Sequence, residues 1–88
     1  MKKNNEYILR SIAGEHILIA TGKAASEFNG MIHLSEVAAY VWNHLDEAAG
    51  VEELVQMVLG EYDVDEATAR ADVQKFVDSL LEYHMAEM

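Results

Sequence analysis

The side chains that could carry out catalysis are few, and their spacing does not suit it. The chain has no cysteine, which excludes disulfides, thiolate zinc sites and a cysteine nucleophile. No serine lies in a Gly-x-Ser-x-Gly turn, and the five glycines are isolated, so no phosphate-binding loop is present. No two of the four histidines are three or four residues apart, as a metal pair on one helix face would be (His16, His33, His44 and His84). We therefore expect a protein that is not an enzyme and that holds neither a cofactor nor a metal.

The first part of the chain has the pattern of short strands. Residues 6–12 and 16–20 are rich in β-branched and aromatic side chains, and Ala13-Gly14-Glu15 between them is a turn signal. This predicts a β-hairpin. Residues 21–26 are expected to form a loop, and 27–30 a strand or a turn. Residues 31–34 are a third strand candidate.

From residue 35 the apolar spacing changes to that of helices. A first helix is expected over about 36–46, with Ser35 as its N-cap and Trp42 in the core. A second covers 51–59, with Gly60 at the position after its end. A third opens at Asp65 as N-cap. Strands followed by helices indicate an α+β fold, and no linker divides residues 1–88, so we expect a single domain.

The charge of −10 is confined to the second half of the chain. Residues 1–45 hold four basic and four acidic side chains, whereas residues 46–88 hold two basic and twelve acidic ones. Such a surface repels nucleic acid, although acidic helices also serve solubility alone. The chain has no apolar segment of membrane-spanning length and no signal-peptide pattern, so we expect a cytoplasmic protein.

Two features of the pattern favour peptide binding. The third helix has an apolar arc of about 160°, wider than the ~100° that one core needs. The arc contains Ala69, Val73, Phe76, Val77, Leu80, Leu81 and Tyr83. The strand at 31–34 has neither charge nor proline to protect its edge, so a peptide strand could be added there. Alternatively, the helix is central and both flanks of its arc are buried internally.

The order and spacing of many apolar positions resemble those of the PqqD-like family over about residues 7–83. The matching segments are Tyr7-x-Leu9, Gly14-Glu15-x-x-Leu18-Ile19, Leu34-Ser35-x-x-Ala38-x-x-x-Trp42-x-x-Leu45-Asp46, Val51-x-x-Leu54-Val55, Tyr62-Asp63-Val64 and Ala69-x-x-Asp72-Val73-x-x-Phe76-Val77-x-x-Leu80. The chain departs from the family pattern at Leu34-Ser35, at 46–50 and at 84–88, which argues against a role specifically in quinone cofactor synthesis.

The resemblance implies a winged-helix-like fold in which a three-stranded antiparallel sheet is followed by three helices. It also implies a non-catalytic protein that binds the leader segment of a ribosomally made precursor peptide. Such proteins present the leader to a maturation enzyme, often a radical S-adenosylmethionine enzyme. Carried over to this chain, the resemblance places the peptide-binding residues on the third strand and third helix: Met31, Ile32, His33, Leu34, Arg70, Val73, Gln74, Phe76 and Val77.

Two other functions share this architecture. One is an acidic winged-helix adaptor without a peptide ligand, and the other is a DNA-binding winged-helix regulator. DNA binding is disfavoured because a recognition helix needs basic and amide side chains, whereas the third helix is acidic. Which flank of the third helix lines a peptide groove stays open at this point.

Overall fold

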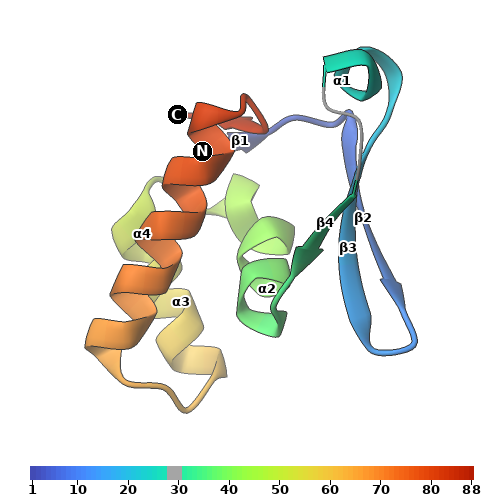
Figure 1. Cartoon of the computed structure of the whole chain (residues 1–88). Helices are drawn as coiled ribbons and strands as arrows, with labels where there is room; N and C mark the ends of the chain where they lie inside the picture. The colour runs from blue at the N-terminus through green and yellow to red at the C-terminus, as the bar shows by residue number, and fades with distance from the viewer. Residues whose placement is uncertain (28–30) are drawn as a thin grey trace.

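A computed structural model describes residues 1–27 and 31–88 of the chain. It contains a three-stranded antiparallel sheet in the order β2-β3-β4, with α2, α3 and α4 on one side of it (Figure 1). A smaller two-stranded sheet joins β1 to β5. In chain order the elements are β1 (Lys2–Lys3), β2 (Tyr7–Ile12), β3 (Glu15–Ala20), α1 (Gly22–Glu27), β4 (Met31–Leu34), α2 (Glu36–His44), the 3-10 helix η1 (Leu45–Glu47), α3 (Val51–Glu61), α4 (Glu66–Glu82) and β5 (Ala86–Glu87). The predicted α+β class and its three-stranded sheet are confirmed.

The hairpin of β2 and β3 forms where the sequence predicts it. Ile12 pairs with Glu15, so only Ala13 and Gly14 lie in the loop. Both have positive φ, 53° and 82°, as a type I′ turn requires. Glycine adopts this conformation without a steric penalty, whereas Ala13 adopts it because the flanking strands fix the register.

The expectation of a loop at residues 21–26 is wrong, because α1 occupies Gly22–Glu27. Its first turn is held by Glu6, whose Oε1 accepts a hydrogen bond from the Ala24 backbone N–H at 2.9 Å. The Thr21 hydroxyl also donates to the Glu6 carbonyl at 2.7 Å. Both bonds join segments that are distant in sequence, so local composition gives no sign of them. Of the expected strand or turn at 27–30, residues 28–30 lie outside the described residues.

Two of the three later helices, α2 and α4, start where their caps predict. Ser35 Oγ accepts from the Ala38 N–H at 3.1 Å at the start of α2, and an Asp65 carboxylate oxygen accepts from the Thr68 N–H at 3.1 Å at the start of α4. The predicted single helix over 36–46 is instead α2 followed by η1.

The predicted helix end at Gly60 is wrong. Gly60 lies inside α3, which runs to Glu61 and is capped by Tyr62, whose N–H donates to the Val58 carbonyl at 2.8 Å. The Tyr62 ring packs edge-on against Tyr40 of α2, with the ring centroids 5.5 Å apart. A glycine inside a helix costs about 1 kcal/mol relative to alanine, which a tertiary contact of this kind can offset.

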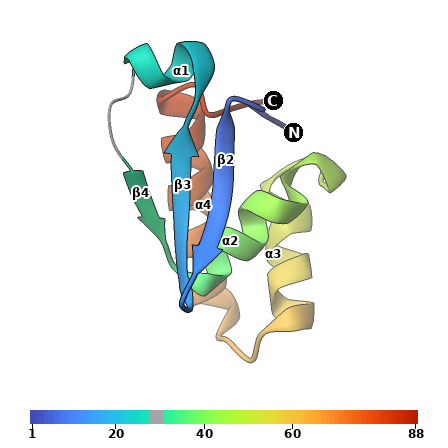
Figure 2. The same ribbon diagram turned by 90° about the vertical axis from the view of Figure 1, so that its right-hand side faces the viewer.

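The core lies between the helix-facing side of the sheet and the three helices. Leu18 comes from β3, and Val41, Leu54 and Val73 come one from each helix; all are at most 1% exposed. Trp42 is 2% exposed, which confirms its predicted core position. The sheet is therefore covered by helices on one side, while its other side faces outward (Figure 2).

The two ends of the chain lie together, and no local pattern in the sequence predicts this contact. Lys2 pairs with Glu87 and Lys3 with Ala86, and the Asn4 N–H donates to the Met85 carbonyl at 2.8 Å. Strands of two residues are too short to have a recognisable alternation, so only the tertiary structure reveals them. Over residues 1–27 and 31–88, no helix is long and apolar enough to cross a bilayer.

Candidate functional site

β4 is an edge strand, and its backbone pairing can be worked out from the register. Antiparallel strands alternate between pairs that share hydrogen bonds and pairs that do not. The two-residue turn makes Ile12 and Glu15 a hydrogen-bonded pair, so residues 17 and 19 of β3 also bond to β2. Residues 16 and 18 then bond to β4, where they face Leu34 and Ile32.

The remaining backbone groups of β4 point away from the sheet. Because Ile32 and Leu34 bond inward to β3, the N–H and C=O groups of Met31 and His33 lie on the outer edge. On this edge no other described strand pairs with β4. The edge therefore offers two donors and two acceptors, spaced as an added strand requires.

A groove lies between this edge and α4. It encloses about 300 Å³ and is largely apolar. β4 supplies Ile32, His33 and Leu34, and α4 supplies Phe76, Ser79, Leu80 and Tyr83; Leu18, Ser35, Ala38 and Met85 complete the lining. The strand edge and the groove adjoin because the side chains of Ile32 and Leu34 turn toward the helices, and both are half-buried.

The groove is lined by one particular flank of α4. Phe76 and Tyr83 lie on this flank, and Tyr83 is 58% exposed. The opposite flank faces α3, since Arg70 binds Glu52 of that helix and Val77 is only 1% exposed. The wide apolar arc therefore serves two purposes: its middle and one flank are buried in the core, and its other flank borders the groove.

Two further hollows adjoin the groove toward the start of α4. One of about 70 Å³ is bordered by Val73 and Phe76 together with the first turn of α2. The other, of about 510 Å³, is a more open depression lined by Asp72, Lys75 and Ser79 of α4 together with His33 at the edge of β4. Within residues 1–27 and 31–88 Lys75 forms no ion pair, so its ammonium group is available to an anion.

Of the nine residues expected to bind peptide, four line the groove: Ile32, His33, Leu34 and Phe76. Val73 borders the adjoining small hollow but is 1% exposed, so it offers little contact surface. Met31 is 61% exposed, with its side chain on the outer side of the sheet. It can contribute only backbone groups to the groove edge.

Three of the residues expected to bind peptide do not line this groove. Val77 belongs to the core, because it lies on the side of α4 that faces the other helices. Gln74 is exposed and donates to Asp78 at 2.8 Å along the helix surface. Arg70 is bound by Glu52 of α3 and by Glu66, one turn before it, at 3.1 Å.

The ion pairs of Arg70 also shift the pKa values of the groups that form them. Hydrogen bonds to Glu52 and then to Glu66 raise the pKa of Arg70 above its ordinary value. The same bond from Arg70 is the largest cause of the lowered pKa of Glu52. Arg70 is thus engaged between α3 and α4 and is not free to anchor a peptide carboxylate.

Several groove residues were not predicted as site residues. Leu80 and Tyr83 belong to the apolar arc already recognised in the sequence, so choosing the correct flank would have found them. Ser79 is polar and gives no such signal. Met85 is 3% exposed and reaches the groove through the chain reversal at His84, which has a φ of 58°.

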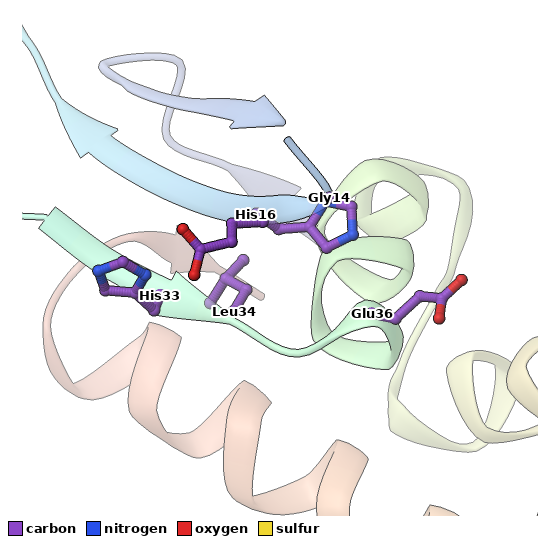
Figure 3. Close-up of a pocket in the computed structure, with 6 residues that line it drawn as sticks. Gly14, His16, His33, Leu34 and Glu36 are labelled. Atoms are coloured by element: carbon purple, nitrogen blue, oxygen red, sulfur yellow. The ribbon is translucent and has the colours of Figure 1, made fainter. Parts of the chain in front are cut away.

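A separate hollow at the turn end of the sheet contains two histidines but no convergent site (Figure 3). His16 is on the same side of the sheet as its neighbour Leu34, whereas His33 points to the other side. The His16 Nδ1 is also 2.7 Å from Ser11 Oγ. Within the described part of the chain, no three histidine or carboxylate side chains are grouped as metal ligands.

Comparison with known proteins gives two matches. The model of the family described as coenzyme PQQ synthesis protein D (PqqD) matches residues 15–86. A solved structure titled "TbiB1 in Complex with the TbiA(beta) Leader Peptide" is similar with a TM-score of 0.71 and 25% sequence identity. That similarity covers 99% of this chain and 95% of the other. No curated protein gives a significant match.

Proposed function

Because the chain belongs to the PqqD family, whose model matches residues 15–86, we propose that it binds the leader segment of a precursor peptide. The protein would hold the leader and present the rest of the peptide to a maturation enzyme, without catalysing a reaction itself. The observation that carries this proposal is the apolar groove of about 300 Å³ beside an unpaired strand edge. The similar structure of TbiB1 was determined with a leader peptide, which supports the same class of ligand.

In the proposed complex the leader forms a fourth strand next to β4. Met31 and His33 each offer one outward N–H and one outward C=O, so up to four backbone hydrogen bonds can form. Each is worth about 0.5–1.5 kcal/mol net. Backbone bonds supply affinity for any extended peptide but carry little sequence preference.

Sequence preference would come from the groove. Alternate residues of an added strand point to the same side, so every second leader side chain would turn toward α4. Apolar residues at two such positions fit between Ile32 or Leu34 of the strand and Phe76 or Tyr83 of the helix. A neighbouring leader carboxylate could reach Lys75. For a contact of this size we expect a Kd between about 1 nM and 10 µM, since ordering the peptide offsets part of the gain.

The identity of the enzyme is a further part of the proposal. We expect a maturation enzyme, for example one of the radical S-adenosylmethionine type, that acts on the part of the precursor beyond the leader. We also propose that residues 1–88 act as one unit, since the Lys3 N–H donates to Asp46 at 2.8 Å and β1 pairs with β5. Because ribosomes make such precursors in the cytoplasm, we propose that the protein binds its precursor there.

A DNA-binding role is not favoured by the charges near α4. Helix α4 carries Asp72 and Asp78 on its exposed surface, and Arg70 is already paired with two glutamates. Duplex DNA should therefore bind no more tightly than the nonspecific range of ~10⁻⁴–10⁻⁶ M at physiological salt. A gel-shift titration that gives sequence-selective binding at micromolar protein would indicate a regulator instead.

The proposal is tested by amide chemical-shift mapping with synthetic peptides that cover each short reading frame neighbouring the gene. A leader should shift the amides of 31–34 and 76–83 and leave α3 unchanged. Tyr83→Ser should weaken binding about tenfold, because the 58%-exposed ring would be buried by the peptide. The matched control is Val64→Ser, which alters a 38%-exposed side chain away from the groove. Binding with shifts only in the first hairpin or α3 would refute the placement, and the absence of binding by every peptide would refute the function.

A further inference from the structure

Among residues 1–27 and 31–88, no helix covers the outward side of the main sheet, yet much of this side is apolar. Figure 2 shows β2, β3 and β4 in front, with α2, α3 and α4 behind them. Strand alternation places one set of side chains on this outer face. The set comprises Ile8, Arg10, Ile12, Glu15, Ile17, Ile19, Met31 and His33. Five of these eight side chains are apolar, and we call the set the outer sheet face.

The apolar members are contiguous across the three strands. Ile8, Ile19 and Met31 are directly paired in one row, and Ile17 is central in the next row. Ile8 is 41% exposed and Met31 is 61% exposed. Ile12, at the end of β2, is 60% exposed. Ile17 and Ile19, in the central strand, are half-buried. A contiguous, partly exposed apolar surface of this kind is a candidate for a protein–protein contact.

The charge distribution indicates which partner fits this face. The chain carries −10, and the excess lies in residues 46–88, that is, in η1, α3, α4 and the C-terminus. Two copies that approach by these elements repel each other. Besides His33, the outer sheet face carries one basic and one acidic side chain, Arg10 and Glu15, whose charges balance. Neither Arg10 nor Glu15 takes part in an ion pair among the residues that the structure describes.

We propose that this protein self-associates through the outer sheet face, with the sheets of two copies packed face to face about a twofold axis. β3 is the central strand of the sheet. It therefore faces β3 of the partner copy whether the twofold axis runs parallel to the strands or perpendicular to them in the plane of the contact. Ile17 and Ile19 then lie at the centre of the contact in either case. The acidic helices of the two copies point away from each other, which keeps repulsion low.

The size of the face limits the strength of this association. The three strands, of six, six and four residues, span roughly 250 Å², from a strand spacing of ~4.8 Å and a rise of ~3.3 Å per residue. Stable dimers bury about 800 Å² on each partner. The association should therefore be weak and reversible. The outer edge of β4 and the groove beside α4 stay uncovered in this arrangement, so self-association does not depend on leader binding.

Sedimentation equilibrium tests the proposal on the intact chain without any peptide. Between about 10 µM and 1 mM, the weight-average mass should rise from 9.8 kDa toward twice that value. Raising NaCl from ~0.05 to ~0.5 M should strengthen association, because screening reduces repulsion between the acidic chains. Ile17→Thr keeps a β-branched residue at the centre of the face and should weaken association at least about fivefold.

Val64→Thr is the matched control, because it makes the same kind of change at an exposed side chain outside the sheet. It should leave association unchanged, and circular dichroism should show that both variants are folded. A mass of 9.8 kDa at every concentration and salt would overturn the proposal. Association that Ile17→Thr and Val64→Thr affect equally would overturn the assignment to the outer sheet face.

Discussion

Proline substitutions at neighbouring positions of β4 should have opposite consequences for folding and for binding. The register places the Ile32 N–H inward, toward β3, and the His33 N–H outward, on the free edge. Proline removes the N–H and fixes φ, and it is tolerated in a sheet only where the N–H faces outward from an edge. We therefore expect Ile32→Pro to damage the fold and His33→Pro to spare it.

The magnitudes follow from the groups that lose a partner. Ile32→Pro deletes one ladder bond, worth about 1 kcal/mol, and leaves the opposing Leu18 carbonyl unsatisfied, which costs about 1–3 kcal/mol. The total is roughly 2–4 kcal/mol, out of the about 4–13 kcal/mol expected for a domain of this length. This corresponds to a fall in Tm of about 8–32 °C. His33→Pro breaks no ladder bond and should cost less than about 1 kcal/mol.

Thermal unfolding followed by circular dichroism measures the first half of this prediction. Titration with the leader peptide measures the second half, where His33→Pro should lose tenfold or more in affinity because it deletes a donor of the binding edge. Ser11→Pro is the control, since the Ser11 N–H lies on the outer edge of β2, which is the edge of the sheet opposite to β4. It should be folded and should bind normally.

Two results would refute this reasoning. If His33→Pro lowers Tm as much as Ile32→Pro, the inward and outward assignment of the β4 backbone is wrong. If His33→Pro is stable and binds the leader with unchanged affinity, the peptide does not pair with this edge.

The remaining predictions concern the residues around α4. Arg70→Ala should change the free energy of unfolding in urea only slightly, because its ion pairs are exposed, and it should leave leader affinity unchanged. Val77→Ala should cost about 1–3 kcal/mol by the same measurement, since it leaves a cavity at a 1%-exposed site, and the folded variant should still bind the leader. The pKa of Glu52 is lowered in the folded state, so its pairing stabilises the fold above the ordinary value of 4.5 and is lost as pH falls below it. In acid titrations Glu52→Gln should therefore lose less stability than the parent chain between about pH 5 and pH 3.

Much of the framework follows from the sequence because it depends on local patterns. Ala13-Gly14 between two β-branched runs specifies a two-residue turn, and Ser35 and Asp65 specify helix starts through their own side-chain oxygens. The alternation in 31–34 identifies a strand without edge protection. The wide apolar arc of α4 correctly indicates that this helix has more apolar surface than one core requires.

Tertiary structure alone decides which side of that arc borders the groove. Val77 is buried in the core on the flank where Arg70 pairs with Glu52 of α3, so Phe76 and Tyr83 lie on the flank beside β4. The helical pattern is symmetric about Val73 and cannot distinguish the two flanks.

Long-range contacts determine the rest. Glu6 holds the first turn of α1 across 18 residues of sequence, and the pairing of β1 with β5 joins opposite ends of the chain. Such contacts depend on which segments the packed core brings together, and a local window contains only one of the two partners. The inward or outward direction of each backbone group in β4 is of the same kind. It is set by register, because a shift of one residue would turn the N–H and C=O groups of His33 inward to β3 and those of Ile32 outward to the free edge.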